Sequence, residues 1–194
     1  MTSSRDAGER PGEEAHHVLF STSLGACAVA WRARGIRWIL LPERSPEATS
    51  ARLVTLAGAS VASAPPAAVQ ASIDRIVRHL ETGAEDLSTI LLDMEDLPPF
   101  SRRVYEITRA VPPGEVRTYG EIANLIGAPA ATRAVGQALG KNPFPIVVPC
   151  HRVVAAGHRP GGFSAPGGLD TKAHLLAIEG RSLTSGEQTT FRFR

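Results

Sequence analysis

Cys150 and His151 are neighbours in the chain, and together they could act as a nucleophile and its base. A thiol becomes a good nucleophile at neutral pH when a nearby histidine or cation lowers its pKa from about 8.5. A buried carboxylate such as Glu179 could orient the imidazole in turn. Taken alone, a Cys-His pair is more often structural than reactive, so the surrounding sequence has to decide.

Neighbouring side chains on an extended strand point to opposite faces. Cys150 and His151 can therefore cooperate only if the chain turns between them or a water molecule bridges them. Pro149, which fixes its own backbone angle, is consistent with a turn. The apolar run before it, residues 142–148, is typical of a strand and would deliver the thiol to the site.

Two short helices are expected upstream of this run. Thr118 and Glu121 have the spacing of a capping box at the start of the first helix. Pro129 and Gly140 are suited to the two ends of the second, residues 130–139. Two such helices joined by a tight turn are typical of a helix-turn-helix, although a hairpin packed on the protein's own core has the same pattern.

The second helix is composed mostly of small residues, with Arg133 as its one long cation. This composition favours close approach of the helix to another surface. Charge is also unevenly distributed: residues 1–98 carry 9 Lys and Arg against 13 Asp and Glu, whereas residues 99–181 carry 10 against 5. Such asymmetry is what a polyanion-binding half would show, and scattered surface charge explains it equally well.

The first half of the sequence predicts a small α/β unit in which we find no chemistry. Predicted strands cover residues 17–22, 26–31, 36–41 and 89–92, and predicted helices cover 46–57 and 66–83. Cys27 is expected to be a buried small residue, and with His16 and His17 it falls short of a four-ligand zinc pattern, so we expect no metal. Only two cysteines are present, which favours a reducing, cytoplasmic location.

A proline-containing connector at residues 94–99 marks the expected domain boundary, and a helix at 100–111 follows it. The predicted organisation is a disordered N-terminus (1–15), an α/β domain (16–95), a helix-turn-helix domain (99–181) and a tail (182–194). No apolar run approaches the roughly 18–20 residues that span a bilayer, so no membrane association is expected.

The sequence from about 100 to 180 resembles the O6-alkylguanine-DNA alkyltransferases, also called methylated-DNA–protein-cysteine methyltransferases. The resemblance is carried by several motifs in the family's order, at residues 114–119, 133–136, 142–143, 149–153, 162–164, 167–169 and 172–180. It implies an RNase H-like α/β domain followed by a mostly α-helical, winged helix-turn-helix-like domain. The first 98 residues fit only by length and by their strand–helix pattern.

The resemblance implies a role for each matching residue in taking an alkyl group from a base that is flipped out of the duplex. Cys150 would attack the alkyl carbon, His151 would deprotonate it through water, and Glu179 would hold the imidazole. The remaining implied site residues are Tyr119 as proton donor and phosphate contact, Asn142 as brace, Arg133 as the finger filling the gap, Ala130, Thr132, Ala134 and Gly136 on the DNA, and Ser164, Phe163 and Val153 on the substrate base.

The implied function is direct-reversal repair of O6-alkylguanine in double-stranded DNA, with O4-alkylthymine as a further candidate substrate. The thioether product is a very poor leaving group, and neither a cofactor motif nor a resolving thiol lies near Cys150, so each molecule should act once without a cofactor. Phe163 replaces a tyrosine found in many relatives, and residues 165–166 look inserted. Both differences place the shape of the substrate loop, and with it the role of Ser164, in question.

Two alternatives remain open at this point. A lesion-binding protein with an inert Cys150 predicts DNA affinity that is indifferent to Cys150→Ser. A cysteine hydrolase using Cys150, His151 and Glu179 predicts turnover and no need for Arg133. The absence of a four-cysteine zinc cluster argues against a transcriptional switch, and a monomer is expected.

Overall fold

The computed structural model describes residues 15–58 and 60–182. Its sheet has the order β3-β2-β1-β4. Three predicted strands are confirmed: β1 (Ala15–Thr22), β2 (Gly25–Arg32) and β3 (Gly35–Leu40) form an antiparallel meander, while β4 (Ser60–Ala62) pairs parallel to β1. Strand β4 was not predicted, because three residues are too few to show a two-residue alternation.

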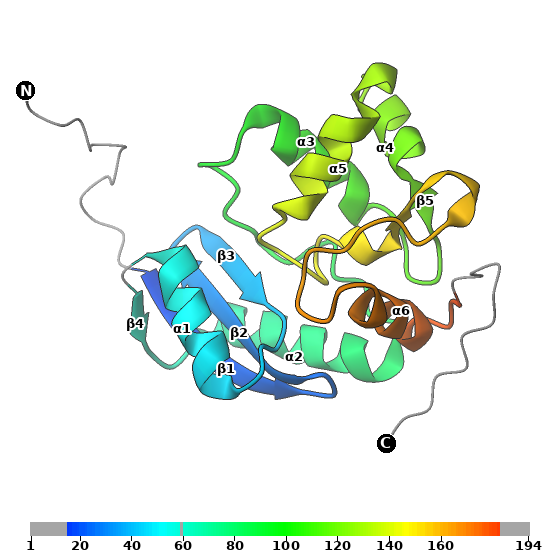
Figure 1. The fold of residues 1–194 in the computed structure, drawn as a ribbon. Coiled ribbons are helices and arrows are strands. Elements are labelled where there is room, and N and C mark those ends of the chain that lie inside the picture. Colours follow the sequence, from blue (N-terminus) through cyan, green and yellow to red (C-terminus); the bar gives the residue numbers. More distant parts are fainter. Residues whose placement is uncertain (1–14, 59, 183–194) are drawn as a thin grey trace, which may run out of the picture.

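Two predicted helices are confirmed, and they cover opposite faces of this sheet (Figure 1). Helix α1 (Pro46–Ala57) begins at Ser45, whose hydroxyl accepts from the Ala48 amide, and α2 (Ala67–Thr82) ends at Gly83. Alternate residues of β2 serve the two faces: Ala28 and Ala30 pack with α1, whereas Cys27, Val29 and Trp31 belong to the core under α2. Cys27 is thus buried, as expected.

The second half is mostly helical, as predicted. It comprises α3 (Pro99–Arg109), β5 (Arg117–Thr118), α4 (Tyr119–Leu125), the 3₁₀ turn η1 (Pro129–Ala131), α5 (Thr132–Gly140), the 3₁₀ turn η2 (Cys150–Arg152), β6 (Val153–Val154), η3 (Ala156–His158) and α6 (Gly168–Ile178). The Thr118–Glu121 capping box is confirmed, and β5 pairs parallel to β6. Helix α3 ends two residues earlier than predicted, and the first turn of the helix predicted at 130–139 is the 3₁₀ turn η1.

Two predicted strands are wrong. In segment 89–92 only Leu92 makes a bridge, to Ile36. Segment 142–148 forms consecutive turns, because its backbone is satisfied internally: the Val148 amide donates to the Phe144 carbonyl at 2.7 Å. An apolar run can be buried without being extended, so hydrophobicity alone did not distinguish the two.

The two halves share one continuous hydrophobic core. The Ile39 amide of β3 donates to the Pro143 carbonyl at 2.8 Å, and the end of α2 lies against the end of α6 (Figure 1). At that contact a Cβ on Gly83 would lie 2.1 Å from the Ile178 carbonyl oxygen, and Gly83 also has φ +70. Only glycine fits there. None of the helices in residues 15–58 and 60–182 is long and apolar enough to cross a membrane; the predicted disordered N-terminus and the tail lie almost wholly outside these ranges.

Candidate active site

The chain turns sharply at Cys150, as cooperation with His151 requires. The Cys150 amide donates to the Val148 carbonyl at 2.8 Å, and the Arg152 amide donates to the Pro149 carbonyl at 2.8 Å. Cys150 is half-buried and opens onto a cavity of about 260 Å³. The cavity is otherwise lined by Tyr119, Gly136, Leu139, Gly140, Gly162, Phe163 and Ser164, from the start of α4, from α5 and from the loop before α6.

Asn142 braces the turn that presents Cys150. Its amide nitrogen donates to the Val148 carbonyl at 2.8 Å, and its amide oxygen accepts from the Phe144 amide at 3.0 Å. Burial raises the pKa of the Cys150 thiol, whereas a hydrogen bond from Asn142 and the charge of Lys172 lower it. Asn142 therefore fixes the position of the thiol and favours its ionised form, which is the nucleophile.

His151 is fully buried and paired with Glu179. Its Nε2 lies 2.8 Å from Glu179 Oε1, while its Nδ1 has no hydrogen-bond partner within the described part of the chain. Because an ionised carboxylate only accepts, Nε2 carries the hydrogen and Nδ1 is left as a proton acceptor. Burial lowers the pKa of His151, so the ring is held in the neutral form that a base needs.

The Glu179 carboxylate is completely buried and accepts hydrogen bonds from several sides. Arg152 donates through Nε and Nη2, at 2.8–3.1 Å, and also binds the Val111 carbonyl. Burial alone would raise the pKa of Glu179, but hydrogen bonds from His151, His79 and Arg152 outweigh it and hold that pKa far below its usual range. The carboxylate therefore stays ionised and can stabilise a protonated His151.

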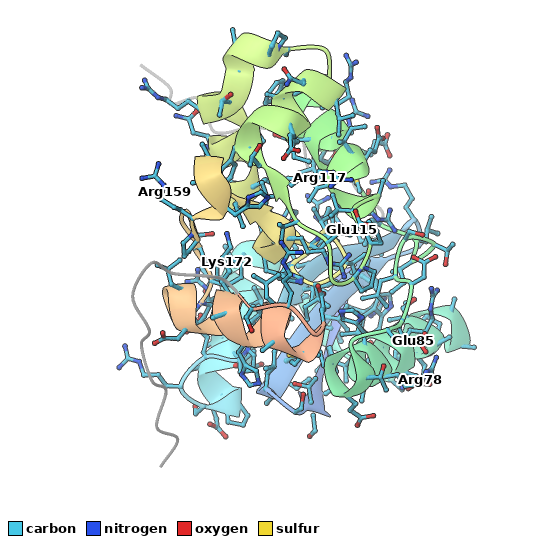
Figure 2. All side chains as sticks on the ribbon, turned by 90° about the vertical axis from the view of Figure 1, so that its right-hand side faces the viewer. Arg78, Glu85, Glu115, Arg117, Arg159 and Lys172 are labelled. Atoms are coloured by element: carbon cyan, nitrogen blue, oxygen red, sulfur yellow. The ribbon has the colours of Figure 1, made fainter. Side chains whose placement is uncertain are left out.

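Sequence reasoning missed two buried groups at this site. His79 reaches Glu179 from α2, in the half where no chemistry was found. Lys172 points from α6 toward β6 (Figure 2) and donates to the Val153 carbonyl at 2.6 Å, and burial lowers its pKa to about 8. The available signal was a histidine beside Ile76 and Leu80 on the apolar face of α2, and a lysine at helical spacing from Leu175 and Leu176 on α6.

Tyr119 closes one side of the cavity. Its hydroxyl donates to the Gly162 carbonyl at 3.4 Å, and its ring lies so close to two glycines that a Cβ on Gly161 would sit 3.1 Å from it and one on Gly136 3.9 Å. Burial raises the pKa of Tyr119, and the nearby Cys150 raises it further. The hydroxyl therefore remains protonated at neutral pH, and it can donate to a bound molecule once its single hydrogen leaves the Gly162 carbonyl.

Comparison with known proteins finds its match in the part of the chain that contains Cys150, His151 and Glu179. Residues 99–181 match the family model of the 6-O-methylguanine DNA methyltransferase DNA-binding domain. The chain is 56% identical to a methylated-DNA–protein-cysteine methyltransferase of Mycolicibacterium paratuberculosis over 82 residues, 42% of this chain and 48% of that protein. The methylated-DNA–protein-cysteine methyltransferase of Methanothermobacter thermautotrophicus is 36% identical over 121 residues, 62% of this chain and 66% of that protein. Residues 99–181 thus match the DNA-binding domain of the 6-O-methylguanine DNA methyltransferases.

Solved structures extend this likeness to both halves of the alkyltransferase fold. Mycobacterium tuberculosis OGT-R37K has a TM-score of 0.67 and 29% identity, over 89% of this chain and 96% of that chain. The same organism's OGT in complex with DNA has a TM-score of 0.65 and 29% identity, over 87% and 95%. In sequence, by contrast, the chain spans about half the length of the first curated relatives it matches.

Apart from Tyr119, the residues expected on DNA all lie on η1 and the first turns of α5, and their exposure differs. Ala130, Thr132 and Arg133 are exposed on η1 and α5, while Ala134 and Gly136 are half-buried on the same helix. Arg133 does not line the cavity. Helix α5 thus carries Arg133 outside the cavity and Gly136, Leu139 and Gly140 in the cavity wall.

The three residues expected to contact the substrate differ in whether they line the cavity and whether their polar groups are already bonded. Phe163 and Ser164 line the cavity, but the Ser164 hydroxyl donates to the Gly140 carbonyl at 2.9 Å. Val153 is buried, and its carbonyl already accepts from Lys172. A second lone pair remains on that oxygen. Within residues 15–58 and 60–182, no group of three or more His, Cys, Asp or Glu could hold a metal ion.

Proposed function

We propose that this protein repairs alkylated DNA by transferring the alkyl group from O6 of guanine to Cys150. The observation that carries the proposal is the half-buried Cys150 thiol, which opens onto a cavity directly before the buried His151–Glu179 pair. As the sulfur–carbon bond forms, the bond from that carbon to O6 breaks. The thiol proton passes through water to His151 Nδ1, and Tyr119 donates a proton to the departing base. Each molecule acts once, and O4-alkylthymine is a second candidate substrate.

Recognition of the lesion is assigned to the second half of the chain. In the proposal the helix-turn-helix is formed by α4 and α5, the small residues of α5 approach the minor groove, and Arg133 fills the gap left by the flipped base. The M. tuberculosis relative solved with DNA supports a double-stranded DNA partner. The same proposal describes the two domains, at 16–95 and 99–181, as RNase H-like and winged helix-turn-helix-like. It also includes a monomeric state and a cytoplasmic location.

Substrate contacts are proposed for Ser164, Phe163 and Val153. Phe163 would pack on the base, and the Val153 carbonyl would accept from the guanine amino group with its free lone pair. For Ser164 to donate toward O6, its hydroxyl must release the Gly140 carbonyl, since one hydroxyl has a single hydrogen.

Intact mass spectrometry tests the reaction. After incubation with a short duplex carrying one O6-methylguanine, the wild type should gain the mass of one methyl group per molecule, and Cys150→Ser should gain none. Cys27→Ala is the matched control and should still gain a methyl group, because Cys27 is fully buried and burial raises its pKa to about 11. A bound duplex without any mass gain would establish a lesion sensor, and repeated turnover without mass gain would establish a hydrolase.

The role of Arg133 predicts a difference between duplex and single-stranded substrates. Unstacking a base costs a few kcal/mol in a duplex and least in a single strand, so Arg133→Ala should slow methyl uptake from the duplex by about 10-fold or more and leave single-strand uptake nearly unchanged. Arg78→Ala is the control, since Arg78 of α2 pairs with Glu85, and Figure 2 shows both of them on the opposite side of the view from Arg159. Equal slowing on both substrates would contradict a base-flipping role. Duplex affinity of the wild type should also fall as salt rises.

A further inference from the structure

We propose that His79 is a positioning residue for the transfer reaction, through which α2 holds the Glu179 carboxylate that pairs with His151. The inference rests on the proposed function and assigns a part in it to the half of the chain that carries no reactive group. In the remaining described residues before position 99, no other side chain donates to Glu179.

The contact is direct and buried. His79 Nε2 lies 3.1 Å from Glu179 Oε1, the same oxygen that His151 Nε2 approaches at 2.8 Å. Both imidazole side chains are 1% exposed, and the carboxylate is 0% exposed. Since a carboxylate only accepts, both rings carry their hydrogen on Nε2, and two imidazoles share one oxygen.

The backbone leaves His79 little freedom to move away. His79 lies in the last turn of α2, and the Gly83 amide closes that turn by donating to the His79 carbonyl at 2.7 Å. Gly83 in turn touches the Ile178 carbonyl of α6, one residue before Glu179. The ends of α2 and α6 are therefore held together at the level of the carboxylate.

A second donor on Oε1 changes how the carboxylate acts on His151. Each hydrogen bond stabilises the negative charge and makes it less able to retain a proton on a neighbouring imidazole. The charged and titratable groups near His151 are Glu179 directly after α6, Arg152 and Cys150 on η2, Lys172 on α6, and His79 on α2. Burial lowers the pKa of His151, Glu179 raises it, and Arg152 and His79 lower it. Removing His79 should therefore raise that pKa.

Arg152 already binds both oxygens of Glu179, so a role for His79 has to be distinguished from simple filling of space. Two amide variants make the distinction. In His79→Gln the side-chain nitrogen can occupy the place of Nε2, whereas in His79→Asn it falls short, near the place of Nδ1. Both variants put a neutral amide in the same buried position.

The experiment measures the single-turnover rate of methyl uptake from the O6-methylguanine duplex between pH 5 and pH 9. We expect His79→Asn to be about 10-fold slower than the wild type, in line with loss of an outer-shell hydrogen bond at a reactive site. As the pH is lowered, the rate of this variant should begin to fall at a higher pH than the rate of the wild type, because its His151 has a higher pKa and protonates earlier. His79→Gln should restore both the rate and the pH profile, and DNA affinity should be unchanged in both variants.

Equal rates for the two amide variants, with the pH profile of the wild type, would overturn the assignment. Thermal unfolding of each variant, and the fraction of molecules that take up methyl, correct the rates for unfolded protein. A wild type that takes up no methyl group would refute the proposed function itself. A wild type that takes up methyl, beside an Asn variant that matches it at every pH, would refute only the role of His79.

Discussion

Glu179→Gln is expected to remove about 3–5 kcal/mol from the free energy of unfolding, because it leaves the Arg152 guanidinium buried without its counter-charge. An amide has one accepting oxygen, whereas both oxygens of Glu179 now accept from Arg152. One N–H donor of Arg152 must therefore face the NH₂ group of the new glutamine side chain. Methyl uptake should slow as well, by at least about 10-fold, since protonated His151 loses the charge that stabilises it.

Urea unfolding at pH 7 measures the first effect, and methyl uptake at a temperature where the variant is folded measures the second. Glu115→Gln is the matched control: Glu115 pairs with Arg117 on the surface (Figure 2), and its side chain is 50% exposed. That change should alter stability by less than about 1 kcal/mol. A loss at Glu179 no greater than the loss at Glu115 would refute the account of a buried, obligatory carboxylate.

Asn142→Ala is expected to release the turn that presents the thiol. Two hydrogen bonds within the turn would lose their partner, each at about 1–3 kcal/mol where the freed group stays buried. The Cys150 thiol would also lose one of the contacts that lower its pKa. At pH 7.5 the variant should therefore react more slowly with iodoacetamide as well as with the O6-methylguanine duplex.

The two reagents separate the causes. Iodoacetamide reports the ionised fraction and access of the thiol, whereas the duplex also requires an intact cavity. Asn124→Ala, an exposed position on α4, should leave both rates unchanged. An Asn142 variant that keeps its iodoacetamide rate would show that Asn142 does not assist ionisation of Cys150.

Much of the site could be predicted because its signals are local. The Thr118–Glu121 capping box depends on three residues of spacing, and the structure confirms it. The turn at Cys150 follows from requiring that adjacent side chains cooperate, and Pro149 makes such a turn easy. The pairing of His151 with Glu179 is also found, over 28 positions: the sequence offered Glu179 as one candidate, and the resemblance to a known family assigned it this role.

Other parts depend on packing that no local pattern records. His79 and Glu179 are 100 positions apart, and a buried histidine on an apolar helix face does not reveal its partner. Segment 142–148 is as hydrophobic as a strand, yet Ile146 takes a φ of 74, a backbone angle that a β-branched residue adopts only when its surroundings enforce it. In the loop around Ser164, the serine hydroxyl donates to the Gly140 carbonyl, 24 positions away in the sequence.

The close seam between α2 and α6 has a consequence for modularity. Every residue that lines the Cys150 cavity lies after position 99, which suggests that the matched segment 99–181 could function by itself when fused to another protein. Cutting the chain before it would, however, remove the Gly83 backbone from Ile178 and uncover the flank of a carboxylate that is 0% exposed in the whole protein. Water would then solvate that charge and compete for its donors. The smallest unit worth grafting onto another protein is therefore the whole two-part body, not the half that carries the thiol.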